Sequence, residues 1–246
     1  MASLHRRRTR VVLGLAVLLA VAAPLAVWLR NSSLVRVERV AVTGISGSQA
    51  EQIRRALEVE AREMTTLHVR EDALLRAVTQ YPVVRSLRAE TDFPHGLRIV
   101  VNAHEPVAAL RASGGGLTAV AGDGTLLPGS AARGLPLVGI RTTPGGGRLG
   151  RGETLGAVRL LAAAPRALRA RVERVYRGPR GLAATMHSGP KLYFGGEARL
   201  DAKWGAAAQV LAHRTSRGSS YVDLRVPERP VAGGLQPRLP EAKPQL

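Results

Sequence analysis

The feature that most constrains this chain is an uncharged run of nineteen residues near its N-terminus, VVLGLAVLLAVAAPLAVWL, from Val11 to Leu29. As an α-helix, such a run is long enough to cross a hydrocarbon core of about 30 Å. Trp28 lies where an interfacial aromatic residue is expected, and Pro24 is tolerated in a membrane helix. The run therefore predicts a transmembrane helix over residues 11–29.

The residues that flank this run predict its orientation. Four arginines precede it on a tail of ten residues: Arg6, Arg7, Arg8 and Arg10. The positive-inside preference keeps such a tail in the cytoplasm. A cleaved signal peptide is the alternative, because Ala20-Val21-Ala22 resembles a small-residue cleavage site, but the apolar run continues well beyond it. We therefore expect residues 1–10 in the cytoplasm, an uncleaved single-pass anchor, and the remainder outside the cytoplasmic membrane.

The composition of the 246-residue chain limits the functions that the part outside the membrane can have. Its 45% of apolar residues are enough for one core of ordinary size or two small ones. Aromatic residues make up only 3%, too few for a platform that stacks single-stranded nucleic acid, and the absence of cysteine excludes disulfides, thiolate nucleophiles and Cys-ligated zinc. The net charge of +18 attracts phosphate, anionic lipid or acidic wall polymer alike, and a general bias toward arginine accounts for it equally well.

The first exported segment has the periodicity of a small α+β unit over residues 34–105. LVRVERVAVTG alternates apolar and polar residues as a strand does. QAEQIRRALEV and EDALLRAVTQY have helical spacing, and Pro82 is expected to end the second helix. VVRSLRAETDF and GLRIVVNAHE follow as strands around a turn at Pro94-His95-Gly96. The predicted order is strand, helix, helix, strand, strand, and the predicted core positions of the helices are Ile53, Leu57, Leu74 and Val78.

Residues 106–232 change to short strands separated by glycine and proline, which predicts a mostly antiparallel β domain with short helices. Strands are expected in VAALRAS, LTAVA, TLLPG, RVERVYR, GLAATMHS and KLYFGG. Helices are expected in ETLGAVRLLAAA and EARLDAKWGAAAQVLAHRT, and the second sets Leu200, Trp204 and Leu211 on one face. Residues 133–152 are expected to form a loop, and residues 233–246 a disordered tail.

The stretch SSYVDLRVPERPV, residues 219–231, predicts the last strand of this domain. Its polar face carries Tyr221, Asp223 and Arg225, which alternate with apolar residues. No further strand is predicted after it, so the edge of the sheet is expected to lack a cover from the chain itself. An exposed edge is either an aggregation hazard or a docking site. Two alternatives follow for this edge: Pro227 and Pro230 protect it, or another protein adds a strand near residues 229–233.

Three motifs suggest chemistry, and a purely structural role is favoured for each. Ser188-Gly189-Pro190-Lys191 fits the S-x-x-K motif of penicillin-binding enzymes, but Gly-Pro between strands predicts a turn, and S-D-N and K-T-G are missing. GGGRLG, residues 145–150, fits G-x-G-x-x-G without the flanking strand and helix of a dinucleotide site. His104-Glu105 lacks the second histidine of a zinc helix. We therefore expect no catalytic, cofactor or metal site.

The order of these segments resembles that of the FtsQ and DivIB family of bacterial cell division proteins. The resemblance rests on VERVAVTG, YPVVRSLRAETDFPHGLRIVVNAHEPVA, AGDGTLLP and GEARLDAKWGAAAQVLAHRTSRGSSYVDLRV, which cover nearly all of the exported region. It implies an α+β architecture, with a polypeptide-transport-associated (POTRA) domain over residues 34–105 and a β domain over residues 106–232. It also implies a non-enzymatic scaffold at the division septum that binds FtsB and FtsL, or DivIC.

The resemblance favours a partner strand near residues 229–233 over mere edge protection, and it implies which residues bind such partners. The partner-binding arginines of the family align with Arg180 and Arg225, whose guanidinium groups suit carboxylates on an acidic partner strand. Val226 replaces the aromatic residue of some relatives. The expected partner-binding residues are Arg180, Tyr221, Asp223, Arg225, Val226, Arg229, Val231 and Ala232. The alternative functions are a membrane-tethered basic binder of anionic wall polymer or nucleic acid, and a wall hydrolase with paired carboxylates in a cleft.

Overall fold

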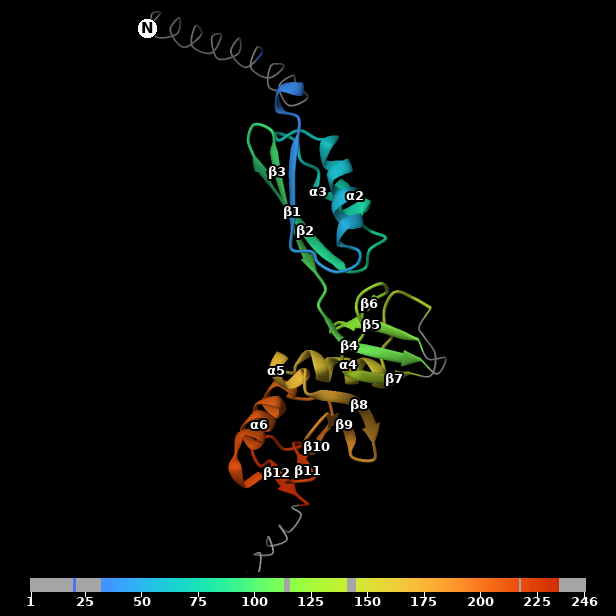
Figure 1. Ribbon diagram of the computed structural model, residues 1–246, viewed down its shortest axis with the longest axis vertical. Coiled ribbons are helices and arrows are strands. Elements are labelled where there is room, and N and C mark those ends of the chain that lie inside the picture. Colours follow the sequence, from blue (N-terminus) through green and yellow to red (C-terminus); the bar gives the residue numbers. More distant parts are fainter. Residues whose placement is uncertain (1–19, 21–31, 113–115, 141–144, 217, 235–246) are drawn as a thin grey trace, which may run out of the picture. The chain divides into compact units, whose positions relative to one another are not determined.

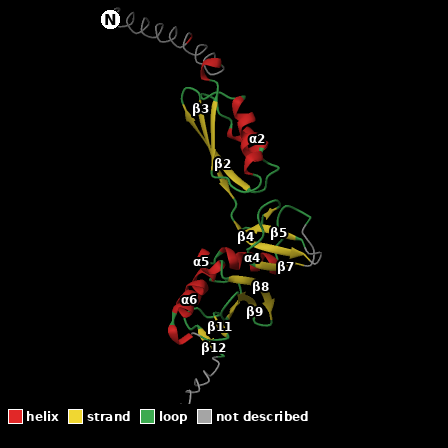
Figure 2. Ribbon diagram, in the orientation of Figure 1, coloured by secondary structure: helices red, strands yellow, loops and turns green. Residues whose placement is uncertain are grey.

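The computed structural model describes residues 20, 32–112, 116–140, 145–216 and 218–234, and the chain forms two compact units, Met1–Ala103 and His104–Leu246 (Figure 1). Each unit combines helices with a β-sheet (Figure 2), which confirms the α+β class. Among the described residues, no helix is both long and apolar enough to cross a membrane. The predicted tail 1–10, and all of the predicted span 11–29 except Ala20, lie outside these residues.

The N-terminal unit is a three-stranded sheet with two helices on one face (Figure 1). Its strands have the order β1-β3-β2, and β3 runs parallel to β1 and antiparallel to β2. The predicted order of strand, helix, helix, strand and strand is therefore confirmed. The elements are η1 (Ser33–Val35, a 3-10 helix), β1 (Arg39–Thr43), α2 (Ala50–Arg62), α3 (Glu71–Ala77), β2 (Val84–Asp92) and β3 (Gly96–Ala103).

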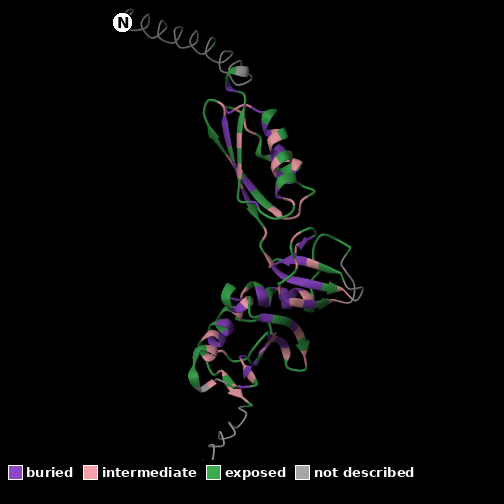
Figure 3. Ribbon diagram, in the orientation of Figure 1, coloured by how far each residue is buried: buried purple, intermediate pink, exposed green. Residues whose placement is uncertain are grey.

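Both helices bury an apolar face against this sheet. The four predicted core residues are each at most 1% exposed and pack in one cluster with strand residues such as Ile99: Ile53, Leu57, Leu74 and Val78. Figure 3 shows buried positions on the side of α2 that faces the strands. Each fully buried large aliphatic side chain contributes about 1.5–3 kcal/mol, so this cluster stabilises the unit.

Two predicted boundaries in this unit are wrong. α3 ends at Ala77 and not at Pro82, because the β-branched residues that follow have low helix propensity and turn bonds replace the helix, such as the bond from the Tyr81 N–H to the Val78 carbonyl at 2.9 Å. The first strand begins at Arg39 and not at Leu34. The preceding residues bond elsewhere, as in the 3.1 Å bond from the Val37 N–H to the Met64 carbonyl.

A buried threonine joins three segments at one end of the N-terminal unit. Thr66 is 6% exposed and lies between α2 and α3. Its N–H donates to the carbonyl of Val35, the last residue of η1, at 2.8 Å. Its hydroxyl donates to the carbonyl of Pro94, in the β2–β3 turn, at 2.8 Å. Thr66 therefore holds the entry of the chain, the interhelical segment and the turn together.

We expect the replacement Thr66→Val to lower the free energy of unfolding of the N-terminal unit by about 1–3 kcal/mol, because the Pro94 carbonyl loses its donor without a change in side-chain volume. Amide hydrogen exchange of β1 and β3, measured on the full chain, reports this loss. The matched control is Thr43→Val, at an exposed position of β1. Equal protection in Thr66→Val and the control would contradict the expectation.

The C-terminal unit is built on a nine-stranded sheet with the order β12-β11-β10-β9-β8-β7-β4-β5-β6. The pairings β4–β7, β7–β8 and β10–β11 are parallel, and the other five between the described strands are antiparallel, so the domain is mostly antiparallel as predicted. Its elements are β4 (Pro106–Ala112), β5 (Leu117–Ala121), β6 (Leu126–Leu127), β7 (Leu137–Ile140), α4 (Glu153–Ala162), α5 (Arg166–Arg169), β8 (Val172–Gly178), β9 (Gly181–Met186), β10 (Lys191–Gly195), α6 (Leu200–Ala212), η2 (Arg214–Ser216, a 3-10 helix), β11 (Tyr221–Asp223) and β12 (Val231–Gly233).

The predicted loop over residues 133–152 contains a central strand, so this prediction is wrong. β7 lies between β4 and β8, parallel to both, and α4 follows it as the crossover to β8. Only Val138 of this four-residue strand is buried, and Gly139 takes the exposed position next to it. The run LVGI is therefore too short to show the period of two between two glycine-rich segments. The short helix α5 was likewise not predicted.

Helix α6 anchors the last strands of the sheet. The centroids of the Trp204 ring and of the Phe194 ring in β10 are 4.6 Å apart. The Trp204 indole N–H donates to the Leu160 carbonyl of α4 at 2.8 Å. The neighbouring Lys203 is 5% exposed, and its ammonium donates to the carbonyls of Phe194 and Gly196, both at 2.8 Å. The predicted apolar face of this helix packs against the core through Leu200, Trp204 and Leu211.

The strand predicted to be the last in the sheet is followed by another. β11 pairs in parallel with β10, and β12 then pairs antiparallel with β11. The prediction that no later segment covers β11 is therefore wrong, because a three-residue strand after Pro230 carries too little alternation to be recognised. Gly233 belongs to β12 and not to the predicted tail, of which residues 235–246 lie outside the described residues.

Candidate protein-interaction site

The candidate site lies at the β12 edge of the nine-stranded sheet. Among the described strands, β12 pairs with β11 alone, with Tyr221 opposite Gly233 and Asp223 opposite Val231. At the other edge the chain covers its own strand, since the N–H of Leu126 in β6 donates to the Gly147 carbonyl at 2.9 Å. A sheet edge can accept a strand from another protein. The β12 edge is therefore the better candidate for docking.

A glycine allows β12 to lie close against β11. A Cβ at Gly233 would collide with the phenol ring of Tyr221, so the ring lies over the bare Cα of this residue. The N–H of Ser220 also donates to the Gly233 carbonyl at 2.9 Å. These contacts fix the position of the edge strand relative to β11. The sequence analysis missed the role of Gly233, because a contact across strands leaves no local signal.

Three of the four tyrosines of the chain lie on the sheet face opposite the main core: Tyr176, Tyr193 and Tyr221. The strand registers align Tyr176 of β8 with Ala183 of β9 and Tyr193 of β10, and then with Asp223 of β11. The rings of Tyr193 and Tyr221 meet edge to face, with centroids 6.1 Å apart. The sequence analysis missed Tyr193, although the alternation of KLYFGG places it opposite the buried Leu192 and Phe194.

Arginines cover this aromatic face. The guanidinium of Arg180 lies 5.0 Å from the centre of the Tyr193 ring, and that of Arg174 lies 5.7 Å from the centre of the Tyr176 ring. Such cation–π contacts keep the charged groups at the surface in fixed positions. Tyrosine and arginine are the residue types that carry most binding energy in protein–protein interfaces. The composition of this face therefore favours a protein partner.

Arg225 is held by Asp223 of the same strand end. Its Nε and Nη2 donate to the carboxylate of Asp223 at 3.0 and 2.7 Å, and its N–H donates to Oδ1 at 3.1 Å. Its aliphatic stem lies over Gly195, where a Cβ would be 2.9 Å from Cγ of Arg225. The hydrogen bond from the Arg225 side chain holds the pKa of Asp223 below its ordinary value against the opposing effect of desolvation, and the charge of Arg180 lowers this pKa further. The structure thus brings Arg180, Asp223 and Arg225 together.

The remaining expected partner-binding residues lie on β12 and on the connection that precedes it. Val226 and Val231 are each 55% exposed, which is high for large apolar side chains. Arg229 is exposed, and its N–H donates to the Val226 carbonyl at 3.1 Å. Ala232 is half-buried and packs against the core, so its side chain points away from solvent. All eight expected residues are therefore exposed or partly exposed, and the side chain of Ala232 faces the core.

The motifs that suggested enzymatic chemistry belong to turns and loops of the fold. Ser188 lies in the β9–β10 turn and Lys191 opens β10, so they are not one helical turn apart. Within the GGGRLG segment, Arg148 donates to the carboxylate of Asp123 at 3.0 Å and ties the segment to the β5–β6 turn. Among the described residues, no group of three His, Asp or Glu side chains is arranged to hold a metal ion.

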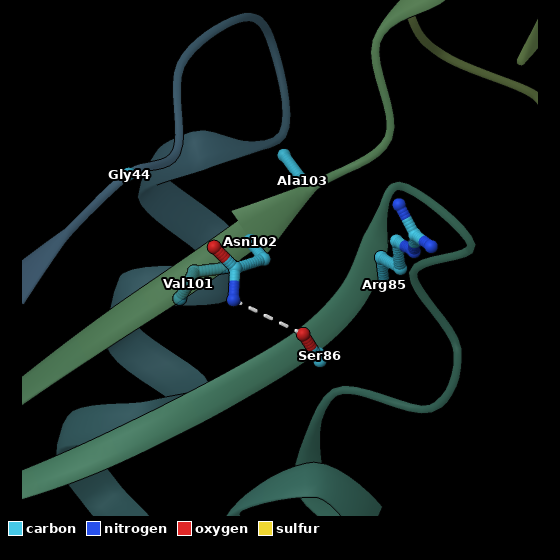
Figure 4. A pocket seen from close by; sticks show the side chains of 6 residues that line it. All are labelled: Gly44, Arg85, Ser86, Val101, Asn102 and Ala103. Carbon is cyan, nitrogen blue, oxygen red and sulfur yellow. Dashed lines mark hydrogen bonds between the residues drawn. The ribbon is translucent and has the colours of Figure 1, made fainter.

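The N-terminal unit contains an open hollow of about 550 Å³ at one end of β3 (Figure 4). It is lined by Gly44, Arg85, Ser86, Val101, Asn102 and Ala103. The Asn102 amide donates to the Ser86 hydroxyl at 3.1 Å, so these two polar groups satisfy each other. The lining contains no carboxylate or imidazole, the side chains that most often serve as general acids and bases.

Comparison with protein families supports this description of the fold. Residues 35–104 match the FtsQ-type POTRA domain, and residues 108–225 match the C-terminal domain of the cell division protein FtsQ/DivIB. A comparison with curated proteins found no match. The fold and the site thus define a POTRA-type module followed by a β-rich domain. The chain belongs to the FtsQ/DivIB family, a family of non-catalytic scaffolds of cell division.

We expect the replacement Arg225→Gln to raise the pKa of Asp223 toward its unfolded value of about 3.9, because the charged hydrogen bond is lost. An Asp whose folded pKa is depressed contributes stability above its unfolded pKa and loses it as pH falls through the folded pKa. The stability difference between the two proteins is therefore present at neutral pH and shrinks below about pH 4.

Titration of the Asp223 carboxyl by carbon NMR measures this pKa directly, and urea unfolding at several pH values measures its linkage to stability. Arg229→Gln is the matched control, because Arg229 is exposed on the same connection and is not among the groups that lower this pKa. The same carboxyl pKa in Arg225→Gln and the wild type would show that the ion pair does not persist in solution.

Proposed function

We propose that the protein is a scaffold of the division septum that captures a partner protein at its β12 edge. The observation that carries this proposal is the outer position of β12 beside the face that holds Arg180, Tyr193 and Tyr221. A partner strand would add to β12 through its main chain, and its side chains would reach this face. Pro230 removes one donor just before β12, so the added ladder is short.

The partner chemistry that fits best is an extended segment with acidic side chains. The guanidinium of Arg180 lies over the Tyr193 ring. Asp223 offsets only one of the two positive charges of Arg180 and Arg225, so the cluster of these three residues stays positive. The bonds of Arg225 to Asp223 use Nε and Nη2, which leaves the Nη1 protons for a partner carboxylate as far as the described residues show. Val226 and Val231 add exposed apolar contacts. Family membership supports FtsB with FtsL, or DivIC, as the partners.

The same proposal includes a membrane anchor and a division of labour along the chain. Residues 11–29 would span the cytoplasmic membrane with residues 1–10 inside, as the apolar run and the preceding arginines indicate. Residues 34–105 would recruit the protein to the septum, and residues 106–232 would hold the partner. The family's association with division sites supports this localisation.

We expect the charge reversal Arg180→Glu to weaken partner capture by about 2 kcal/mol, roughly a thirtyfold rise in Kd, because it places a carboxylate against an acidic segment. Titration of the full chain with an FtsB-like or DivIC-like partner measures the effect. Arg174→Glu is the matched control, since Arg174 makes the same kind of ring contact two strands further from the edge. Equal affinities for wild type and Arg180→Glu would reject this docking site.

We expect protease added outside intact spheroplasts to digest a C-terminal tag and to spare an N-terminal tag. The reason is that four arginines before a long apolar run favour a cytoplasmic N-terminus. Immunoblots for both tags, with a cytoplasmic protein as the control for lysis, give the result. Digestion of the N-terminal tag alone would reverse the proposed topology.

A further inference from the structure

Three large apolar side chains are exposed at the end of the N-terminal unit where the described chain enters it. Leu34 is 61% exposed, Leu67 48% and Phe93 65%. They belong to η1, to the segment between α2 and α3, and to the β2–β3 turn, which lie at the same end of the unit (Figure 1). We name Leu34, Leu67 and Phe93 the apical patch.

Hydrogen bonds of Thr66 hold the apical patch together. Each of its members is the chain neighbour of a residue in the Thr66 bonding set: Leu34 precedes Val35, Leu67 follows Thr66, and Phe93 precedes Pro94. The turn is tied a second time, because the N–H of Glu38 donates to the His95 carbonyl at 2.9 Å. The patch is therefore a preformed surface and not three independent loop residues.

The charges around the apical patch nearly balance. On the segments that carry the patch, the exposed side chains of Arg36, Arg39 and Arg70 are accompanied by those of Glu38, Glu63 and Asp92. Such a mixed rim provides no strong field for a polyanion. The apolar side chains of the patch are therefore its main binding groups, and whatever binds to them must present an apolar surface.

The length of chain between the patch and the proposed membrane anchor identifies that occupant. Leu34 lies only five positions after Leu29, the end of the apolar run, and five residues extend at most about 17 Å. The headgroup region is about 5–7 Å thick on each side of the hydrocarbon core. The end of the unit that carries Leu34 is thus confined close to the lipid interface, at a high effective concentration that makes weak apolar contacts sufficient.

We propose that the apical patch inserts into the outer interface of the lipid bilayer beside the chain's own membrane anchor. The inference rests on the proposed anchor and is independent of partner capture at β12. Apolar side chains of interfacial segments lie about 5–10 Å deep, at the boundary of headgroups and acyl chains. Insertion of three segments at once would fix how the N-terminal unit is oriented on the membrane surface.

The absence of cysteine in the chain allows a direct test with single-cysteine variants. Phe93→Cys and Leu67→Cys, in the full chain, carry an environment-sensitive fluorophore and are reconstituted in nanodiscs of zwitterionic phosphatidylcholine. Ala103→Cys is the control, because Ala103 is exposed at the opposite end of β3. Brominated acyl chains should quench the two patch labels on the order of twofold more than the control label.

A second set of variants tests whether the quenching depends on the apolar side chains of the apical patch. With the label at Phe93→Cys and the tether to the anchor unchanged, the added substitutions Leu34→Ser and Leu67→Ser should lower the quenching of this label, while circular dichroism shows an unchanged fold. Anionic lipid should not increase the quenching, because the rim charges balance. Equal quenching at the patch and control positions, in protein that has entered the nanodiscs, would overturn the inference. Failure of the chain to enter nanodiscs would instead reject the anchor.

Discussion

The attachment of α6 to β10 is the interaction on which the candidate site depends. β10 and β11 are parallel neighbours, so the chain must cross from the end of one to the start of the other, and α6 is that crossover. The Trp204 indole N–H donates to the Leu160 carbonyl and so holds the helix against α4. The Lys203 ammonium donates to the carbonyls of Phe194 and Gly196 at the end of β10. These contacts set the position of α6 and therefore the place where β11 pairs with β10. The position of β12 depends in turn on that of β11.

The buried ammonium of Lys203 shows which hydrogen bonds this attachment requires. Burial is the main cause that lowers its pKa, and the charge of Arg199 acts in the same direction. Carbonyl oxygens, and not a carboxylate, accept from its ammonium in the contacts that the structure describes. A buried ammonium without hydrogen-bond partners would be strongly destabilising, so the two carbonyls must stay in place. The same residue therefore fixes the irregular end of β10, where Gly195 makes room for the stem of Arg225.

In both units, contacts within the chain fix the exposed side chains of a proposed binding surface. In the N-terminal unit, the buried Thr66 ties three loop segments together, and their exposed neighbours form the apical patch. In the C-terminal unit, Tyr221 over Gly233 and Arg225 on Asp223 set the edge strand and the charged cluster. In both cases contacts within the chain fix the positions of exposed apolar or charged side chains. Such preorganisation reduces the entropy that binding must otherwise overcome.

The sequence by itself determined the secondary structure that has a clear period, together with the family. The alternation of β2 and β3 and the helical spacing of Ile53, Leu57 and Trp204 are local signals, because each buried face repeats along a few residues. The ordered segments from VERVAVTG to YVDLRV carried the family resemblance. The pairing of Arg225 with Asp223, two residues apart, could also have been found in the sequence, although only a partner carboxylate was considered for it.

Only the tertiary structure decided which strands become neighbours and which edge stays open. β7 could not be recognised in its glycine-rich segment, because it has four residues and only Val138 of them is buried. β12 is three residues long, so its existence depends on β11 and on the space that Gly233 leaves for Tyr221. Tyr193 and Arg180 meet only because β9 and β10 pair in one register. Contacts between distant segments have no local pattern, and for that reason the site's geometry required the fold.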